Sequence, residues 1–328
     1  MSPPTAVRPG ATIPLPVADG WEDVREGLAG AGPKRLPARL FYDELGSILF
    51  EAITRLPEYG LARADERILR RQVGAIAALV PAPVIVAELG SGSGRKSRCL
   101  LEALAARAPV TYAPIDVSAE ALARCAAGMA GLPRLTVEPF QADFLAGLRE
   151  MIRRGRDGRP LLVLFLGSTI GNFERPADTA FLRSLRRLLG PGDRLLLGTD
   201  LVQSPERLLA AYDDALGVTA AFNLNLLVRL NRELGADFDT AAFRHLAVWN
   251  RERQRIEMHL VARRAQRVTL RRLGIQVSFA EGERLWTESS NKYAPGEPAR
   301  MAQRAGFEPA AQWIDEEWPC AETLLVAR

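Results

Sequence analysis

The chain has 328 residues, of which 48% are hydrophobic and 25% charged, a composition typical of a globular protein large enough for two lobes. Its 43 basic and 39 acidic residues leave a net charge of only +4, and no basic block alternates with aromatic residues, so nucleic acid is not an expected partner. The three cysteines are far apart and only two histidines are present, so we expect no metal site. No stretch reaches the roughly 18 apolar residues of a membrane span, so we expect no membrane partner and a cytoplasmic protein.

The N-terminal part of the chain divides into a lead-in and a helical pair. Residues 1–35 are rich in proline, glycine and alanine and show little periodicity, which predicts a segment that is extended or partly disordered. Apolar residues then recur at helical spacing over 42–56 and 62–80. This pattern predicts two helices before the first strand.

A regular rhythm of short apolar runs and helix-like segments occupies residues 83–200. The runs are VIVAEL, VTYAPID, LTVEPFQADF, LLVLFLG and RLLLGTD. Continuous apolar strands separated by helices are typical of a parallel sheet covered on both faces. The sequence therefore predicts a doubly wound α/β domain.

The rhythm changes after residue 200. A helical stretch from 204 to about 234 is followed by alternating segments that predict antiparallel strands, and the tail predicts a helix at 298–305 and a strand at 322–326 that rejoins the first sheet. We therefore divide the chain into an α/β domain and a smaller α+β lobe. The domain takes residues 63–202 and 292–328, and the lobe takes 36–62 and 203–291.

A glycine-rich loop follows the first predicted strand. VIVAEL runs into Gly90-Ser91-Gly92-Ser93-Gly94 and then into a helix-like segment, an arrangement that lets a ligand approach backbone N–H groups. Arg95 occupies the third glycine position of a dinucleotide fingerprint, and no GxxxxGK[ST] motif is present, which disfavours a nicotinamide dehydrogenase and a P-loop protein. With Glu88, the loop instead resembles the first motif of class I S-adenosylmethionine methyltransferases.

Acidic residues end the next two predicted strands. Asp116 is placed to accept hydrogen bonds from ribose hydroxyls, and Asp143-Phe144 to flank an adenine ring. The alternative interpretation is that these aspartates are helix caps or turn residues. Together with the glycine loop, they favour a cofactor site.

Four further segments carry a more specific resemblance. They are LFYDELGSILFEAITRLPEYG (40–60), LGSTIGNF (166–173), the stretch 208–239, and IEMHL (256–260) with TESSNKY (287–293). In this order they resemble the L-histidine Nα-methyltransferase family of ergothioneine biosynthesis from about residue 36 to the C-terminus. The resemblance implies a class I methyltransferase domain with a second, substrate-binding lobe. The activity it implies is transfer of methyl groups from S-adenosylmethionine to the α-amino group of histidine, giving the trimethylated betaine hercynine.

The resemblance also implies site residues on both lobes. For the cofactor they are Glu88, Gly90, Ser91, Gly92, Lys96, Asp116, Asp143 and Phe144. For the substrate, Asn172 and Tyr212 would hold the carboxylate, Glu288 and Ser290 the imidazole, and Met258, Tyr59 and Gly167 would line the pocket. We assign orientation of the amine and proton exit to Tyr42 and Thr169. After Tyr59 the chain reads Gly60-Leu61-Ala62, a departure from the family pattern that concerns only the local wall.

Alternative interpretations remain open at this point. Met258 and Phe144 also suit a hydrophobic core, Tyr42 and Tyr212 suit helix packing, and Glu288 and Ser290 suit a turn. We interpret both histidines as structural, and we expect a monomer. Rival functions are an Nα-methyltransferase for another amino acid such as tryptophan, and a non-catalytic protein that binds S-adenosylmethionine. The pair Glu288 and Ser290 disfavours the first rival, and the intact acceptor segments disfavour the second.

Overall fold

The computed structural model describes residues 13–14 and 21–328, and these form two compact units. The first unit contains Ile13–Pro14, Leu61–Val202 and Tyr293–Arg328, and the second contains the described residues from Trp21 to Gly60 together with Gln203–Lys292. The sequence placed the two later boundaries at 202 and 292, so Lys292 falls in the other unit from the one expected. No helix of the described residues is long and apolar enough to cross a membrane.

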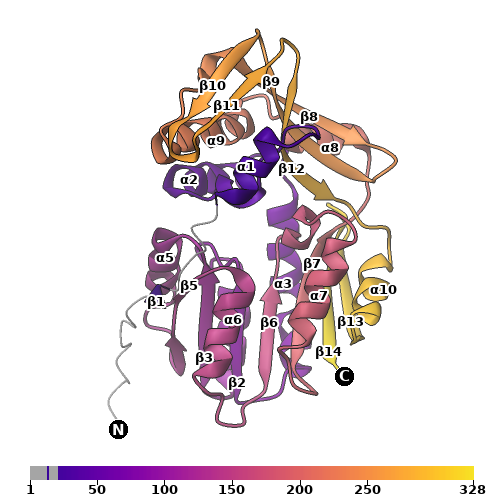
Figure 1. Cartoon of the computed structure of the whole chain (residues 1–328). Helices are drawn as coiled ribbons and strands as arrows, with labels where there is room; N and C mark the ends of the chain where they lie inside the picture. Colours follow the sequence, from indigo (N-terminus) through magenta and orange to yellow (C-terminus); the bar gives the residue numbers. More distant parts are fainter. Residues whose placement is uncertain (1–12, 15–20) are drawn as a thin grey trace. The chain divides into compact units, whose positions relative to one another are not determined.

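The first unit is a nine-stranded sheet (Figure 1). Its main strand order is β1-β5-β3-β2-β6-β7-β14-β13, with β4 paired to β3. The strands from β1 to β7 pair in parallel, whereas β14 lies antiparallel to both β7 and β13. The bounds are β1 Ile13–Pro14, β2 Val84–Leu89, β3 Val110–Asp116, β4 Leu135–Val137, β5 Phe140–Gln141, β6 Leu161–Phe165, β7 Arg194–Asp200, β13 Phe307–Asp315 and β14 Cys320–Ala327.

Helices cover both faces of this sheet because its central strands are apolar on both sides. The strands β2 and β6 are buried at every residue. One face packs on side chains of α6, α7 and α10, and the other on those of α3, α4 and α5. The helices are α3 Leu61–Ala78, α4 Arg98–Arg107, α5 Ala119–Met129, α6 Phe144–Arg153, α7 Ala177–Arg186 and α10 Glu297–Arg304. The doubly wound α/β fold predicted from the sequence is confirmed.

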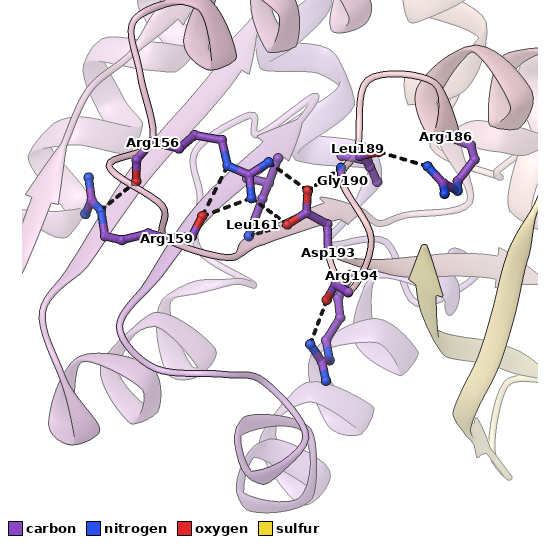
Figure 2. A network of polar contacts seen from close by, with 9 residues as sticks. Arg156, Arg159, Leu161, Arg186, Leu189, Gly190, Asp193 and Arg194 are labelled. Carbon is purple, nitrogen blue, oxygen red and sulfur yellow. Dashed lines mark hydrogen bonds and ion pairs between the residues drawn. The ribbon is translucent and has the colours of Figure 1, made fainter. Parts of the chain in front are cut away.

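A buried carboxylate ties together the loops that precede β6 and β7 (Figure 2). Asp193 is 2% exposed and accepts two hydrogen bonds from the Arg156 guanidinium, at 2.5 and 2.7 Å. It also accepts the backbone N–H groups of Leu161 at 2.9 Å and Gly190 at 2.8 Å. Because these contacts lie where β6 and β7 begin, they are at the opposite strand ends from the glycine loop, and their role is structural.

The second unit combines helices with antiparallel strands. Its three-stranded sheet has the order β12-β9-β8, and a separate hairpin pairs β10 with β11. The helical segments are α1 Glu22–Ala29, α2 Glu44–Ile53, α8 Pro205–Tyr212 and α9 Val218–Leu234. The strands are β8 Phe243–Asn250, β9 Arg255–Ala262, β10 Gln266–Leu270, β11 Ile275–Phe279 and β12 Arg284–Asn291. The α+β character expected for this part is present.

The structure corrects three expectations. Residues 21–35 are not an extended lead-in, because α1 buries Val24 and Leu28, four residues apart on one helix face. The single helix expected over 204–234 is two helices, since Gly217 between them takes a left-handed φ of 73°. No strand was predicted at 307–315, yet β13 forms there at the sheet edge, where Pro309 is tolerated.

Candidate functional site

The glycine loop lies at the carboxyl end of β2. Gly90, Gly92 and Gly94 take φ values of 72°, 52° and 68°, which a residue with a Cβ rarely adopts. A Cβ on Gly94 would also lie 2.6 Å from the Cys125 sulfur. Beside them, the Ser91 hydroxyl is buried and makes no hydrogen bond within the described residues. A tight turn of left-handed glycines beside a buried serine hydroxyl is typical of a loop that binds a ligand.

Glu88 lies beneath this loop and is 3% exposed. Its carboxylate accepts a hydrogen bond from Ser97 Oγ at 2.7 Å and another from the Tyr112 hydroxyl. Burial raises the pKa of Glu88 despite these two donors. The carboxylate is therefore joined to the residues that follow the loop and to β3, and its predicted contact with the cofactor stays a prediction.

Asp116, at the end of β3, is bonded to the loop directly. Its Oδ2 accepts the Gly92 N–H at 3.0 Å and its Oδ1 accepts the Ser118 N–H at 3.0 Å. Burial raises the pKa of Asp116. An ionised carboxylate offers about four lone-pair sites, so these two bonds leave acceptor capacity for a ligand hydroxyl.

Asp143 and Phe144 lie at the start of α6. Asp143 caps this helix by accepting the Ala146 N–H at 2.9 Å, so the cap interpretation holds for it. The Phe144 ring packs edge-on against Phe165, with centroids 5.4 Å apart. A Cβ on Gly90 would lie 3.4 Å from the same ring, which places Phe144 beside the glycine loop.

Lys96, Gly167 and Thr169 lie close together in this unit. Gly167 has a φ of 70°, and a Cβ there would lie 3.2 Å from Lys96 Nζ and 4.0 Å from Thr169 Oγ1. Thr169 donates its hydroxyl to the Leu166 carbonyl at 3.0 Å. Thr169 begins a short 3-10 helix, Thr169–Asn172, which follows β6 and places Asn172 at the carboxyl edge of the sheet.

A buried acidic cluster holds Lys96, and the sequence analysis missed it. Asp65 is fully buried and accepts the Lys96 ammonium at 2.7 Å and the Cys320 thiol at 3.2 Å. Glu322 is also fully buried, and carboxylate oxygens of Asp65 and Glu322 and the Cys320 sulfur lie within 4.8 Å of one another. Burial, followed by the Asp65 charge, raises the pKa of Glu322 well above its usual value.

The pKa of Lys96 reflects the same cluster. Burial by itself would lower this pKa, but the Asp65 carboxylate outweighs burial and the net pKa is raised. The ammonium already supplies the positive charge that balances Asp65. The cluster could not be predicted from residue spacing, because its members come from α3 and β14, which are far apart in the sequence: Asp65, Cys320 and Glu322.

In the second unit, the three predicted tyrosines belong to one aromatic cluster. The Tyr42 ring lies 5.7 Å from Phe50, the Phe50 ring 6.4 Å from Tyr59, and the Tyr59 ring 6.2 Å from Tyr212, all edge-on. Phe222 of α9 contacts both Tyr42 and Phe50. The packing interpretation of Tyr42 and Tyr212 therefore holds, and the cluster also brings all three phenols into one region.

Polar groups of β12 meet Tyr212, which ends α8. Tyr212 donates its hydroxyl to Ser290 Oγ at 2.7 Å, and the buried Lys292 ammonium donates to Ser290 Oγ at 2.8 Å and to Tyr212 Oη at 3.0 Å. Lys292 was not predicted, although it lies two residues after Ser290 in the quoted TESSNKY segment. The alternation of strand side chains was the signal that could have found it.

Glu288 shares this face of β12. It pairs with Met258 across the ladder to β9, and Met258 is 2% exposed. Burial raises the pKa of Glu288 to about 7, although the Lys292 charge opposes that rise. The turn interpretation of Glu288 and Ser290 is wrong, because both lie within a regular strand.

The predicted site residues thus form two groups, one in each unit. The first holds the cofactor candidates with Gly167, Thr169 and Asn172, and the second holds Tyr42, Tyr59, Tyr212, Met258, Glu288 and Ser290. His245, also in the second unit, makes the contacts expected of a structural histidine: its Nε2 lies 2.8 Å from the Tyr212 carbonyl oxygen and its Nδ1 lies 2.9 Å from Asn223 Nδ2.

Known proteins similar to this chain agree with the motifs. A sequence model of the family described as histidine-specific methyltransferase, SAM-dependent, matches residues 21–327. The histidine N-alpha-methyltransferase of Mycolicibacterium smegmatis is 46% identical over 89% of this chain and 90% of that protein, and that of Mycobacterium tuberculosis is 44% identical over 90% of each. Ergothioneine biosynthesis protein 1 of Neurospora crassa is 32% identical over 86% of this chain and 32% of that longer protein.

Fold, motifs and relatives converge on one assignment. The parallel sheet with an antiparallel β14 inserted beside β7, and the glycine loop after β2, form a class I methyltransferase domain. The family match spans nearly every described residue, including the strand that carries Glu288 and Ser290. The chain belongs to the family of histidine-specific, S-adenosylmethionine-dependent methyltransferases.

Proposed function

We propose that this protein transfers methyl groups from S-adenosylmethionine to the α-amino nitrogen of L-histidine, forming the trimethylated betaine hercynine for ergothioneine biosynthesis. One observation favours histidine over other amino acids. Glu288 and Ser290 lie on one face of β12, a carboxylate beside a hydroxyl, with Met258 opposite them. Such a pair matches the two nitrogens of an imidazole ring. Membership of a histidine-specific family supports the same choice.

The residues of the first unit suit S-adenosylmethionine. We assign the cofactor to the loop of Gly90, Ser91 and Gly92, whose glycines, which have no Cβ, let a ligand approach the backbone closely. Asp116 has remaining acceptor capacity for ribose hydroxyls, and Phe144 offers an aromatic face near Gly90. Glu88 supports the loop from below, Asp143 fixes the start of α6 beneath Phe144, and Lys96 is held by Asp65.

The acceptor needs to be held and deprotonated, since the sulfonium of the cofactor supplies an already activated methyl group. We assign the substrate carboxylate to Asn172 and Tyr212, whose side chains are uncharged donors. Tyr42 and Thr169 would orient the amine and carry its proton away, with Gly167 leaving room beside Thr169 and Tyr59 offering an aromatic face to a cationic product. No covalent nucleophile takes part, so alignment of donor and amine supplies most of the rate.

Mass spectrometry of products tests this function. The protein is incubated with S-adenosylmethionine and each common amino acid separately, and mass gains of one, two or three methyl groups are recorded. A gain on histidine alone is expected. A gain on tryptophan instead would keep the fold and cofactor but remove the imidazole assignment of Glu288 and Ser290, and no gain on any amino acid would favour a protein that only binds the cofactor.

The cellular setting is also part of the proposal. We place the protein in the cytoplasm as a monomer that acts on a free amino acid. All three cysteines are free thiols, and Cys125 and Cys320 are buried among apolar and acidic groups, which suits a reducing compartment. Light scattering at micromolar concentration would measure the mass in solution directly.

A further inference from the structure

Lys96 is anchored on a buried acid but keeps unused donors. Its ammonium donates to Asp65 Oδ2 at 2.7 Å, and among the described residues it has no second acceptor. An ammonium carries three N–H donors, so two of them remain for another partner. The Lys96 side chain is 27% exposed, whereas Asp65 is fully buried. A ligand can therefore reach the ammonium but not the carboxylate that holds it.

The Asp65 carboxylate is itself fixed by two donors. Oδ2 accepts the Lys96 ammonium, and Oδ1 accepts the Cys320 thiol at 3.2 Å. Asp65 lies on α3 and Cys320 on β14, so a helix and a strand of one unit set the direction of the carboxylate. Although burial alone would lower the pKa of Lys96, the Asp65 charge raises it, so the ammonium keeps its charge.

Gly167 keeps room beside this ammonium. A Cβ at position 167 would lie 3.2 Å from Lys96 Nζ and 3.8 Å from Asp65 Oδ2. Gly167 follows β6, and the glycine loop follows β2, which pairs with β6 in parallel. Both segments therefore lie at the carboxyl edge of the sheet, where open α/β folds bind their ligands. Lys96 presents its free donors at this edge.

Lysine is a rare residue in this chain, and one of the few occurs here. Only three of the 43 basic residues are lysines: Lys34, Lys96 and Lys292. The guanidinium of arginine is planar and broad, whereas an ammonium is a compact charge that donates in three directions. Beside Asp65 and Gly167, the compact group can donate to a buried carboxylate and to a ligand at the same time.

Glu322 is the group that would draw Lys96 away if Asp65 lost its charge. Glu322 is fully buried, and neither of its carboxyl oxygens has a hydrogen-bond donor among the residues that the structure describes. One of these oxygens lies within 4.8 Å of an Asp65 oxygen. An ammonium released by Asp65 would have Glu322 as its nearest carboxyl. The charge would then be balanced, but the ammonium would be displaced.

Resting on the proposed function, we infer that Asp65 is a positioning residue for the cofactor: it holds the Lys96 ammonium where this group receives the carboxylate at the amino-acid end of S-adenosylmethionine. That carboxylate is the one anionic group of a cofactor whose sulfonium and amine are both cationic. It is therefore the part of the cofactor that an ammonium attracts. A charge-assisted hydrogen bond of this kind should contribute about tenfold or more to affinity.

Two ligands that differ only in this carboxylate test the inference. They are S-adenosylhomocysteine and its decarboxylated form, and calorimetry measures the dissociation constant of each. The ratio of the two constants is the carboxylate preference, which should be about tenfold or more in the wild type. Lys96→Met and Asp65→Asn should each lose most of it. Asp65→Glu restores a carboxylate partner for the ammonium and should retain it.

A double variant shows whether Asp65 acts through Lys96. Once Lys96 is replaced by Met, adding Asp65→Asn should change the carboxylate preference no further. An Asp65→Asn effect of full size in the Lys96→Met background would overturn the inference. An Asp65→Asn protein with the wild-type preference would overturn it as well.

Glu66→Gln is the matched control. Glu66 is the next residue of α3 and pairs with Arg70 at 2.8 Å and Arg95 at 3.7 Å, not with Lys96. The variant removes the same charge one residue away, and it should keep the wild-type preference. A loss as large as that of Asp65→Asn would mean that the field of α3 acts without positioning, which contradicts the inference.

A measurement on the wild type covers the case in which Asp65→Asn does not fold. With 15N-labelled lysine, NMR observes three side-chain ammonium groups at most, and Lys96→Met identifies one of them. A held ammonium exchanges its protons slowly, so we expect the Lys96 signal in the free protein and a larger shift with S-adenosylhomocysteine than with its decarboxylated form. No such signal, or equal shifts, would refute positioning.

The same binding data separate the inference from the proposed function. A wild type that binds both ligands equally well would remove the role of Asp65 and Lys96 while leaving the cofactor site in place. A wild type that binds neither ligand would remove the proposed function, and the inference with it.

Discussion

Removing the Asp65 charge should lower the free energy of unfolding only slightly. Removing the Glu322 carboxyl as well should lower it much more. Asp65 is the carboxylate partner of Lys96, at 2.7 Å, and is fully buried. Breaking such a pair by removing one partner costs roughly 3–5 kcal/mol when the other charge stays uncompensated. In this protein a second carboxyl lies close by, because atoms of Glu322 and Asp65 are within 4.8 Å of each other.

The raised pKa of Glu322 is the basis of this expectation. Its pKa is raised well above the usual value by burial first and by the Asp65 charge second. In Asp65→Asn the second cause disappears, so Glu322 can ionise and balance Lys96. We expect Asp65→Asn to lose about 1 kcal/mol of unfolding free energy and Glu322→Gln, which keeps the size and polarity of the side chain, less than about 1 kcal/mol. The double variant should lose about 3–5 kcal/mol, an excess of about 2 kcal/mol over the sum of the two single variants.

Urea unfolding of the wild type and the three variants measures these differences, fitted with two transitions if the two units unfold separately. Calorimetric binding of S-adenosylmethionine to the same proteins reports whether Lys96 is still held in place. Additive losses, with the double variant no worse than the sum, would refute compensation by Glu322. A large loss in Asp65→Asn alone would show that Glu322 cannot take over as partner.

Three other perturbations test separate parts of the structure. Asp193→Ala leaves the Arg156 guanidinium without this partner, so it should lower the free energy of unfolding, measured in urea, by about 3 kcal/mol. The affinity for S-adenosylmethionine, measured by calorimetry, should not change. Asp116→Asn should weaken S-adenosylmethionine binding about tenfold or more, because an amide is a poorer acceptor for ribose hydroxyls than a carboxylate. Histidine binding should weaken as the pH falls through about 7, since a raised pKa makes Glu288 lose its charge there, and Glu288→Gln should remove this one-proton dependence from the pH profile.

The central sheet was predictable because its strands are buried on both faces. Such strands need continuous apolar runs, and β2, β6 and β7 have them. The elements that the sequence did not reveal bury only part of their surface. In α1 just two apolar side chains are buried within a glycine- and proline-rich stretch, and β13 alternates between buried and exposed residues at an edge that includes Pro309.

Site residues were predictable where a motif is local, and less so where the partner is distant. The glycine loop and the Glu288–Ser290 strand are contiguous in the sequence, so resemblance and alternation both apply to them. Lys292 lies in the same segment, yet a lysine is expected at the surface unless its partners are known. Its partners include Tyr212, which is 80 residues away. A contact of this kind is visible only in the tertiary structure.

The acidic cluster did leave one signal in the sequence. Gly198 lies in the middle of β7, where a glycine weakens a buried strand and indicates that something approaches the backbone closely. It pairs across the ladder with Glu322 of β14, and a Cβ at this position would lie 2.8 Å from Glu322 Oε1 and 3.1 Å from the Leu166 Cα. The glycine in RLLLGTD thus makes room for a buried acid that pairing of the last strand with β7 brings into place. Since Glu322 lies beside Asp65, and Asp65 holds the Lys96 ammonium, the antiparallel strand β14 contributes a buried acid near the predicted cofactor loop.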